Sequence, residues 1–409
     1  MALTYVSGTR ATASMAATRE DPFYMQGISV LANWRNPLTL FTQTLQRAIS
    51  DTVPVNWFED QLVPYLTQLN DGSNMTDSDT EMDVDNFSQV AVGDLIEVVR
   101  TGEVVLVTAN TGSHLTIVRE YGVAEGWTSN NAAIVDDDYL RILGNISEQG
   151  RPSPTAITTQ EVAKINYNGD IRTFYELTDI AINSRQRGEQ DQILQDRKKA
   201  VEHQESCERI NFYGKPYAGD KGAYVAATGN TLPTAAGGIR HYLVANANTA
   251  LLPTEDELTM FEFMDDVEAA FAKCTLERDA KEKVCICAPK LRLGLEKWGI
   301  TQQQTFAGQT VMGVPVATWE SSFGTIHFIT HDLLKAPSTA LYNEYYILDM
   351  GALTYVTFNN IGMTSRTEIS SRNTDGATKK GWEYRTIQCV VIEQCETHLY
   401  GQFKTVAAA

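Results

Sequence analysis

The amino-acid sequence predicts an α+β protein with several elongated parts. At 409 residues the chain is too long for one ordinary hydrophobic core, so two or three domains are expected. Residues 183–213 have the composition of one long, charged helix. This helix follows a β-rich, strongly acidic region and precedes a mixed α/β region. This order of segments indicates an extended subunit and not a single compact domain.

The predicted helix 183–213 carries only a narrow apolar stripe. Its apolar residues are Ile193, Leu194, Ala200, Val201, Cys207 and Ile210. A helix packed in the core of one domain normally shows an apolar face about 100° wide. We therefore expect this helix to lie on a surface with little to bury, stabilised by charge pairs such as Glu205 with Arg209.

Composition and charge exclude several classes of protein. The hydrophobic fraction of 43% and the charged fraction of 21% are typical of a folded chain. No apolar run approaches the roughly 18 residues that span a bilayer, and the first twenty residues lack the apolar core of a secretory signal. The net charge of −18 argues against specific nucleic-acid binding, which depends largely on neutralising phosphates.

The charge is distributed unevenly along the chain. Residues 1–50 carry +2, residues 51–163 carry −15 and residues 164–409 carry −5. The first lysine of the chain is Lys164. A weakly basic beginning, a very acidic middle and a nearly balanced remainder indicate segments that face different neighbours.

The first half of the chain is predicted to be an arm followed by β structure. In the arm, Asn36-Pro37 can start a short helix through Leu38, Phe41, Leu45 and Ile49. Residues 53–69 are expected to form one extended strand, and residues 70–86 a polar, acidic loop. Alternating and β-branched residues then predict a small β unit over about 90–145. Its strands are expected at Leu95–Val99, Glu103–Thr108, His114–Arg119 and near Tyr139–Leu143.

The second half is predicted to be mixed. Val162–Ile182 is extended and runs into the long helix, and residues 214–238 form loops and turns. Thr254 and Glu257 are spaced as a capping box, which predicts a helix whose core face holds Leu258, Phe261, Met264, Val267 and Phe271.

Further strands and helices complete a predicted α/β domain over 240–340. Val284–Cys287 is expected to be a buried strand, and Pro289 to open a helix through Leu291, Leu295 and Trp298. Strands are expected at Thr310–Thr318 and Gly324–Thr330. From Tyr345 to Phe403 the pattern is β again, with strands at Tyr346–Leu348, Leu353–Phe358 and from Tyr384 to about Cys395.

The candidate metal and catalytic motifs do not form a site. The acidic run Asp77, Asp79, Glu81, Asp83 and Asp85 has Met82 and Ser88 where a calcium loop needs Gly and Glu. His327 and His331 lie on a predicted strand, where residues four apart are about 13 Å apart. Cys285 and Cys287 are expected to be buried core thiols. No phosphate-binding, nucleophile-elbow or zinc-protease motif occurs. We expect no cofactor, no metal and no enzyme activity.

Several stretches resemble one protein family. They are PVNWFEDQLVP (54–64), VGDLIEVVRTGEVVLVTANTGSHLTIVREYG (92–122), LGNISEQGRPSPTAITTQ (143–160) and CERINFYGK (207–215). In this order they resemble the major capsid proteins of tailed bacteriophages, which have the Hong Kong 97-type fold. The resemblance is to the branch with a small β-barrel or sandwich inserted in the extended loop. It covers about residues 36–400.

The resemblance implies a division of the chain. Residues 1–53 correspond to an N-terminal arm and residues 54–182 to the extended loop (E-loop), with its β insertion at about 90–145. Residues 183–239 correspond to the peripheral (P) domain with its spine helix, and residues 240–340 to the axial (A) domain. Residues 341–409 return to the β-sheet of the P domain.

The resemblance also implies a function and partners. It implies a structural protein of the virion, assembled in the bacterial host cytoplasm. Pentamers and hexamers of this chain build an icosahedral shell around double-stranded DNA, which it contacts only non-specifically. A portal protein and scaffold or decoration proteins are the other implied partners, and no membrane is involved. The alternatives are the shell of an encapsulin nanocompartment and, from another class, a metal-dependent hydrolase with a β-rich accessory domain.

The expected contacts between subunits pair opposite charges. The acidic residues Asp77, Asp79, Glu81, Asp83 and Asp85 are expected to meet the basic residues of a neighbour, Arg185, Arg187, Arg197, Lys198 and Lys199. Trp57 and Phe58 are the expected apolar contact residues. Some members of the family weld subunits with an isopeptide bond from a lysine of the extended loop. No lysine precedes Lys164, so we expect a non-covalent shell.

Overall fold

The computed structural model describes residues 46–407 except for short gaps. The gaps are residues 71, 73, 77, 122–132, 147–149, 151–152, 185–189, 219–233, 247–253, 275–280, 303–306, 312–313, 360, 362–363 and 371–378. The described residues divide into two compact units. Phe58–Lys164 form one, here called the insertion unit, and the described residues on either side of it form the other, here called the main unit.

The insertion unit is a small antiparallel barrel. The strands of its sheet are, in spatial order, β3 (Leu66–Gln68), β8 (Tyr139–Asn145), β5 (Asp94–Val98), β6 (Val104–Asn110), β7 (Leu115–Val118) and β4 (Glu81–Met82). A bridge between Leu69 and Val84 joins the two ends of this sheet. This bridge closes the sheet into a barrel. The expected strands are therefore confirmed, but the unit is larger than the predicted 90–145.

The described part of the acidic segment 70–86 contributes strand β4 and three buried residues to this barrel, which corrects in part the prediction of a solvated loop. Its apolar residues Met75, Met82 and Val84 are buried in the barrel core. The charged residues Glu81 and Asp85 alternate with them and point outward. The segment therefore has the alternation of a half-buried strand, hidden in the sequence by its many acids.

A two-stranded ribbon lies where the chain enters and leaves the insertion unit. It pairs β2 (Pro54–Glu59) with β9 (Val162–Tyr167). The single strand expected over 53–69 is thus two strands, β2 and β3, which belong to different sheets.

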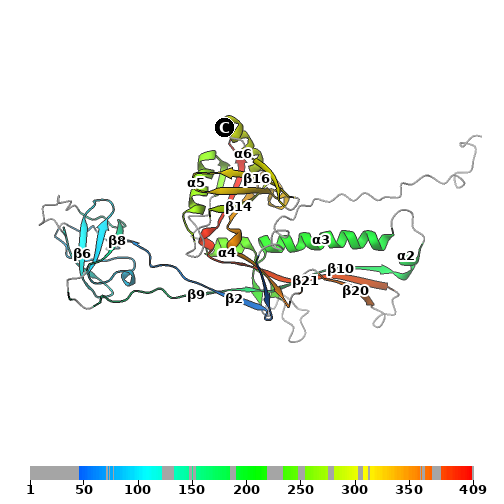
Figure 1. The fold of residues 1–409 in the computed structure, drawn as a ribbon, viewed down its shortest axis with the longest axis horizontal. Coiled ribbons are helices and arrows are strands. Elements are labelled where there is room, and N and C mark those ends of the chain that lie inside the picture. Colours follow the sequence, from blue (N-terminus) through cyan, green and yellow to red (C-terminus); the bar gives the residue numbers. More distant parts are fainter. Residues whose placement is uncertain are drawn as a thin grey trace, which may run out of the picture. The chain divides into compact units, whose positions relative to one another are not determined.

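In the main unit, helix α3 (Asp191–Tyr213) packs on a five-stranded sheet (Figure 1). The sheet consists of β1 (Arg47–Ser50), β19 (Leu353–Phe358), β21 (Lys379–Ile392), β10 (Gly169–Thr178) and β20 (Thr364–Ser370). The long strands β10 and β21 pair antiparallel from Gly169 opposite Gln388 to Thr178 opposite Lys379. Both strands run beneath α3.

The predicted helix 183–213 differs from the structure at its start. A short helix α2 (Asp179–Asn183) follows β10 directly, capped by the Thr178 side chain, and α3 begins at Asp191. Residues 185–189, with Arg185 and Arg187, lie outside the described residues. The short helix predicted around Asn36 also lies outside them, except that Ile49 belongs to strand β1.

A seven-stranded mixed sheet forms the other part of the main unit. Its spatial order is β13 (Thr254–Leu258), β22 (Leu399–Val406), β18 (Asn343–Leu348), β14 (Glu282–Cys287), β17 (Thr325–Thr330), β16 (Val314–Glu320) and β15 (Ala307–Val311). Strands β18 and β22 were expected in the sheet beneath the long helix. They pair instead with β14 and β13, so residues 341–409 contribute to both sheets.

The helix predicted from Thr254 is a strand in its first part, which corrects that prediction. Residues 254–258 form β13, which pairs in parallel with β22. The helix α5 (Met260–Phe271) starts after it, with a capping box made by Thr259 and Glu262. The buried face of α5 holds Phe263, Val267 and Ala270, whereas Phe261, expected in the core, is exposed.

In the same region, the helix predicted from Pro289 is confirmed and the strand predicted over Thr310–Thr318 is corrected. Helix α6 (Pro289–Gln302) starts at the expected proline and buries Leu291, Leu295 and Trp298. The strand expected over Thr310–Thr318 is two strands, β15 and β16, which form a hairpin with Val311 opposite Val314. The remaining described helix is α4 (Ile239–Asn246), and a small hairpin pairs β11 (Tyr217–Ala218) with β12 (Thr234–Ala235).

The largest hydrophobic core joins the seven-stranded sheet to its helices. Phe263 of α5 lies at its centre, with the rings of Trp298, Trp319, Phe328 and Tyr345 at centroid distances of 5.9–6.4 Å. Edge-on and tilted aromatic contacts of this kind add to the free energy gained by burying the rings. The α+β class predicted from the sequence is confirmed.

Candidate functional site

The buried face of α3 is polar, contrary to the expectation that this helix has little to bury. Leu194, Cys207 and Phe212 are buried, and so are His203, Glu208 and Asn211. Buried polar groups are costly unless each is hydrogen-bonded. The partners come from both sheets of the main unit, and we call this set of contacts the polar seam of α3.

Two histidines belong to the polar seam. His203 lies between β10 and β21, with Nδ1 3.0 Å from Thr173 Oγ1 and Nε2 2.7 Å from Thr386 Oγ1. His331, which follows β17, has Nε2 3.1 Å from Glu208 Oε1. His203 thus ties α3 to the five-stranded sheet, and Glu208 ties the same helix to the seven-stranded sheet.

Two further contacts extend the seam along the helix. Gln388 donates to Asn211 Oδ1 at 3.1 Å. Two turns before His203 on α3, the carboxylate of Asp196 accepts hydrogen bonds from the hydroxyls of Tyr175 (3.1 Å) and Tyr384 (2.7 Å). Burial, followed by the hydrogen bond to Asp196, raises the pKa of Tyr384 to about 12, so this hydroxyl remains a donor.

The opposite face of the five-stranded sheet carries a charge cluster. Asp170 lies between Arg172 and Arg385, which are directly opposite each other on β10 and β21. Its carboxylate accepts from Arg385 Nε at 2.9 Å and from Arg172 Nε at 2.9 Å. Partial burial acts to raise the pKa of Asp170, but the two guanidinium groups outweigh it and lower the pKa to about 2. The carboxylate therefore holds together two cations that otherwise repel each other.

Of the five basic residues expected at subunit contacts, Arg197, Lys198 and Lys199 lie on the first half of α3, and Arg185 and Arg187 lie outside the described residues. Arg197 is exposed, and Lys198 and Lys199 are partly exposed. Lys199 pairs with Glu202 of the same helix. The expected pair of Glu205 and Arg209 is confirmed, with 3.6 Å between the charged atoms.

The acidic residues expected at subunit contacts lie on the barrel. Asp83 pairs with the ring of His114, and Asp79 accepts from the backbone N–H of Thr76 at 2.6 Å. Hydrogen bonds from Thr76 lower the pKa of Asp79. Glu81 and Asp85 are exposed, and Asp77 lies outside the described residues.

The two apolar residues expected at subunit contacts behave differently. The Trp57 ring packs edge-on against Tyr242 of its own chain at a centroid distance of 5.7 Å and contacts two cores of the main unit. Phe58, the next residue, is 74% exposed. The alternation of β2 places neighbouring side chains on opposite faces, so only Phe58 is available to another molecule.

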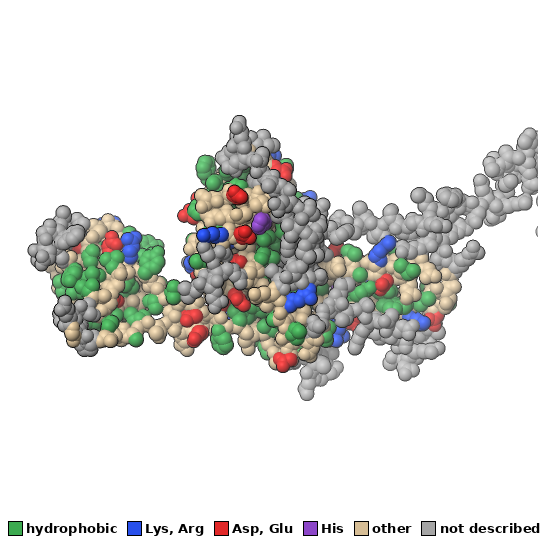
Figure 2. All heavy atoms as spheres, viewed as in Figure 1, with side chains coloured by type: hydrophobic (Ala, Val, Ile, Leu, Met, Phe, Trp, Pro, Cys, Tyr) green, Lys and Arg blue, Asp and Glu red, His purple; other side chains and the backbone are tan. Residues whose placement is uncertain are grey.

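The insertion unit exposes large apolar side chains. They gather on and around β2, β3, β8 and β9, and Figure 2 shows hydrophobic side chains over much of its visible face. The most exposed are Phe58, Leu62, Tyr65, Tyr139, Leu143 and Val162. Isolated exposed apolar residues are ordinary, but clustered ones mark surfaces that contact other molecules.

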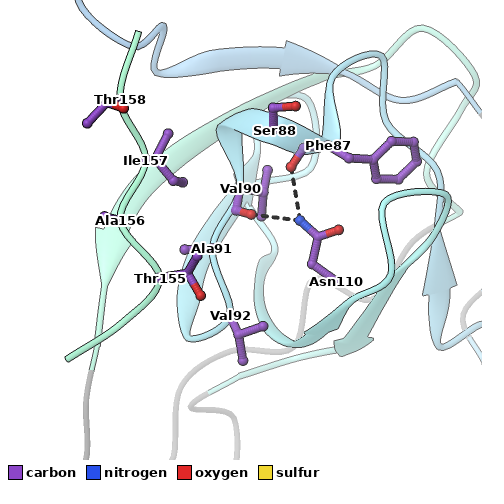
Figure 3. A pocket seen from close by; sticks show the side chains of 10 residues that line it. All are labelled: Phe87, Ser88, Val90, Ala91, Val92, Asn110, Thr155, Ala156, Ile157 and Thr158. Atoms are coloured by element: carbon purple, nitrogen blue, oxygen red, sulfur yellow. Dashed lines mark hydrogen bonds between the residues drawn. The ribbon is translucent and has the colours of Figure 1, made fainter. Parts of the chain in front are cut away.

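A cavity of about 340 Å³ lies beside the barrel, between residues 87–92 and 155–158 (Figure 3). Asn110 donates to the carbonyl oxygens of Phe87 (2.9 Å) and Val90 (2.8 Å), so both hydrogens of its amide are used. The other lining side chains are the ring of Phe87, hydroxyls and aliphatic groups, and no lining residue is ionisable. The cavity therefore has no group for acid–base chemistry.

The metal and thiol candidates lie in separate places. His327 contacts Thr318 with its Nδ1 at 3.2 Å, whereas His331 contacts Glu208. Cys285 and Cys287 are fully buried on β14, as expected. Within the described ranges, no cluster of three or more His, Cys, Asp or Glu is arranged to hold a metal ion. No helix of the described parts is both long and apolar enough to cross a bilayer.

Sequence reasoning missed the polar seam. The missed residues are His203, Glu208 and Asn211 on α3 and their partners Thr173, Thr386, His331 and Gln388. On the helix, residues 203, 207, 208, 211 and 212 recur at helical spacing, but only Cys207 and Phe212 are apolar. The buried face of α3 can therefore be recognised in the sequence only if polar residues at helical spacing are considered together with apolar ones.

Comparisons with known proteins find several that are similar to this chain. A major capsid protein of Pseudomonas phage PaMx41 is 23% identical over 316 residues, which cover 73% of this chain and 70% of that protein. Among solved structures, the capsid of a native gene transfer agent particle has a TM-score of 0.48 at 10% identity and covers 98% of this chain and 99% of that one.

Two other solved structures are also similar. A Mycobacterium phage Bobi structure has a TM-score of 0.46 at 6% identity, covering 96% of this chain and 97% of that one. An encapsulin complex from Synechococcus elongatus has a TM-score of 0.42 at 8% identity, covering 59% and 77%. The family model described as SU10 major capsid protein matches residues 7–398. Because this match covers nearly the whole chain, the protein belongs to the SU10 family of phage major capsid proteins.

Proposed function

We propose that this chain assembles through pentamers and hexamers into a closed icosahedral shell around double-stranded phage DNA. The family match over residues 7–398 carries this proposal. The architecture supports it, because elongated parts with exposed apolar residues gain burial when copies associate. Assembly in the bacterial host cytoplasm, together with a portal protein and scaffold or decoration proteins, belongs to the same proposal.

The two-stranded ribbon supports contacts between copies. A ribbon of two strands is marginally stable in water by itself. Here its β2 strand exposes Phe58, its β9 strand exposes Val162, and the adjoining chain exposes Leu62 and Tyr65. A neighbouring copy that covers these side chains would bury apolar area and supply the stabilisation that the ribbon lacks.

Charge complementarity supports a second contact. The acidic residues Asp79, Glu81, Asp83 and Asp85 lie on the insertion unit, and the basic residues Arg197, Lys198 and Lys199 lie on α3. Asp77, Arg185 and Arg187 belong to the same proposal but lie outside the described residues. We propose that these two groups meet between copies, where opposite charges guide the approach and set the register.

The shell is proposed to be non-covalent. Residues 1–163 contain no lysine, so an isopeptide bond cannot start from a lysine in that part of the chain. The exposed apolar residues and the charge pairs are then the sources of cohesion.

The test is to express the full chain and its Arg197→Ala, Lys198→Ala, Lys199→Ala triple variant, and to examine both by size-exclusion chromatography and electron microscopy. The wild-type chain is expected to form closed particles that dissociate fully to single chains on boiled denaturing gels. The triple variant is expected to remain folded but to form at least about tenfold fewer particles, because it loses the proposed charge contacts.

A matched control removes three exposed lysines away from α3, by Lys281→Ala, Lys297→Ala and Lys335→Ala. This control loses the same charge and should assemble normally. A wild-type chain that stays monomeric at high concentration contradicts the shell, and a ladder of covalent multimers contradicts its non-covalent character. Equal particle yields from the triple variant and the wild type contradict only the charge contact.

A further inference from the structure

The two buried histidines of the polar seam have different partners. His331 faces a carboxylate, that of Glu208, and its Nδ1 accepts from the backbone N–H of Leu333 at 3.2 Å. Among the described residues, His203 has the hydroxyls of Thr173 and Thr386 as its hydrogen-bonding partners. Both rings are almost fully buried, at 3% and 0% exposure. A positive charge on His331 would have a counter-charge in contact, whereas one on His203 would have none.

The charged and titratable groups around His203 do not compensate a positive charge. On the face of β10 and β21 that carries Thr173 and Thr386, the neighbouring titratable side chains are Tyr175 and Tyr384, whose hydroxyls donate to Asp196. The Tyr384 ring lies 6.2 Å from the His203 ring between centroids, at the limit of an effective cation–π contact.

On α3 itself, the neighbours of His203 are Lys199, Glu202 and Cys207. Lys199 and Glu202 pair with each other on the more exposed side of the helix. Burial raises the pKa of Cys207 to about 11, so this thiol is neutral. No carboxylate among the described groups contacts the ring, and burial lowers the pKa of His203 below its usual range.

We propose that His203 makes the attachment of α3 to the five-stranded sheet dependent on pH. The neutral ring donates from one nitrogen and accepts at the other, and so bridges Thr173 and Thr386 across two strands. The protonated ring is a buried cation without a counter-charge, which is costly in a low-dielectric site. Acid then loosens α3 from β10 and β21, while the Glu208–His331 contact to the other sheet persists. This inference does not depend on the proposed shell.

Hydrogen–deuterium exchange of the full chain tests the proposal, measured from about pH 7.5 to about pH 4.5 and corrected for the intrinsic pH dependence of exchange. Peptides from α3, β10 and β21 are expected to exchange at least about tenfold faster at the acidic end. Peptides from β14 and β18 of the seven-stranded sheet are expected to remain protected. Equal protection of α3 at both ends of the pH range overturns the proposal.

Two variants test whether His203, and not His331, causes the pH dependence of α3 exchange. His203→Gln keeps one donor and one acceptor but has no charge in this range, so it should abolish the pH dependence of α3 exchange. His331→Gln leaves His203 intact and should retain it. An equal acid response in His203→Gln overturns the proposal. If that variant does not fold, His203→Asn takes its place, and the wild-type profile alone remains decisive.

His398 is another buried histidine, and its response to acid can be distinguished from that of His203 by the peptides that it affects. Burial, followed by the nearby charge of Lys283, lowers the pKa of His398 to about 4. It lies beside β22 and the short helix at Cys395–Thr397, so its protonation would speed exchange in different peptides. An acid response confined to residues 395–406 therefore counts against His203 as the responsible group.

Discussion

Helices α3 and α5 each pack on a sheet of the main unit, but α3 buries several polar side chains, whereas the buried side chains of α5 are apolar. Helix α5 buries Phe263, Val267 and Ala270 in a continuous apolar core. Helix α3 buries His203, Glu208 and Asn211, each within hydrogen-bonding distance of a strand or of the residue after one. The difference shows that a narrow apolar stripe does not by itself mean an exposed helix.

The two kinds of packing have different energetic consequences. Apolar burial is non-directional and stabilises roughly in proportion to the area removed from water. Each buried hydrogen bond contributes about 0.5–1.5 kcal/mol to stability, but a buried polar group that lacks its partner destabilises the fold because it has lost its hydrogen bonds to water. The hydrogen bonds of α3 therefore fix the position of this helix on the two sheets, whereas the buried residues of α5 stabilise the fold through the apolar area that they remove from water.

The largest expected effect is loss of the aromatic centre of the apolar core. Phe263→Ala should lower the free energy of unfolding by about 4 kcal/mol, because it removes a buried ring and leaves a cavity. Phe261→Ala, two residues away on the same helix, should change it by less than about 0.5 kcal/mol since that ring is 77% exposed. Chemical denaturation monitored by tryptophan fluorescence measures both. Similar losses in the two variants would show that the core is not centred on Phe263.

An intermediate effect on stability is expected for Asp266, a carboxyl group of α5 next to the apolar core. Burial, partly offset by the Tyr345 hydroxyl and reinforced by Glu255, Asp265 and Glu262, raises the pKa of Asp266 to about 6. A carboxyl whose pKa is raised on folding stabilises the fold fully below pH 3.8, and this stabilisation is lost as the pH rises through about 6.

Asp266→Asn should therefore stabilise the protein by about 2 kcal/mol at about pH 8 and by much less at about pH 4. Thermal unfolding at the two pH values measures this difference. Asp265→Asn is the control, because Asp265 is exposed and its replacement should change stability only slightly at either pH. A uniform shift of Asp266→Asn at both pH values would contradict the assigned pKa.

The smallest effect concerns the polar seam. A double-mutant cycle with Asn211→Ala and Gln388→Ala should give a coupling energy of about 1 kcal/mol, because the pair is buried and hydrogen-bonded. The same cycle for Glu205 and Arg209, an exposed pair on the same helix, should give about 0.3 kcal/mol. Urea unfolding of the variants yields both values. Coupling of equal size in the two pairs would remove the distinction between the seam and the helix surface.

Local patterns predicted many elements correctly. The barrel strands β5, β6, β7 and β8 were found from alternation and turn residues, and α6 from Pro289 and its apolar spacing. The start of α5 was placed five residues too early, because Thr254 and Glu257 have capping-box spacing as do Thr259 and Glu262. Pairing of residues 254–258 with β22, nearly 150 residues later in the chain, decides between them.

By itself the sequence determined the fold class and the unequal distribution of charge, since these depend on composition and on patterns within short windows. The family was indicated by the resemblance of several stretches to phage major capsid proteins. Tertiary structure alone decided which sheet receives β18 and β22 and which polar residues of α3 are buried. The physical reason is that a polar side chain such as His203 or Glu208 can be buried only if distant residues supply its hydrogen bonds. Those partners, Thr386 and His331, lie more than 120 residues away, at 183 and 123 positions along the chain.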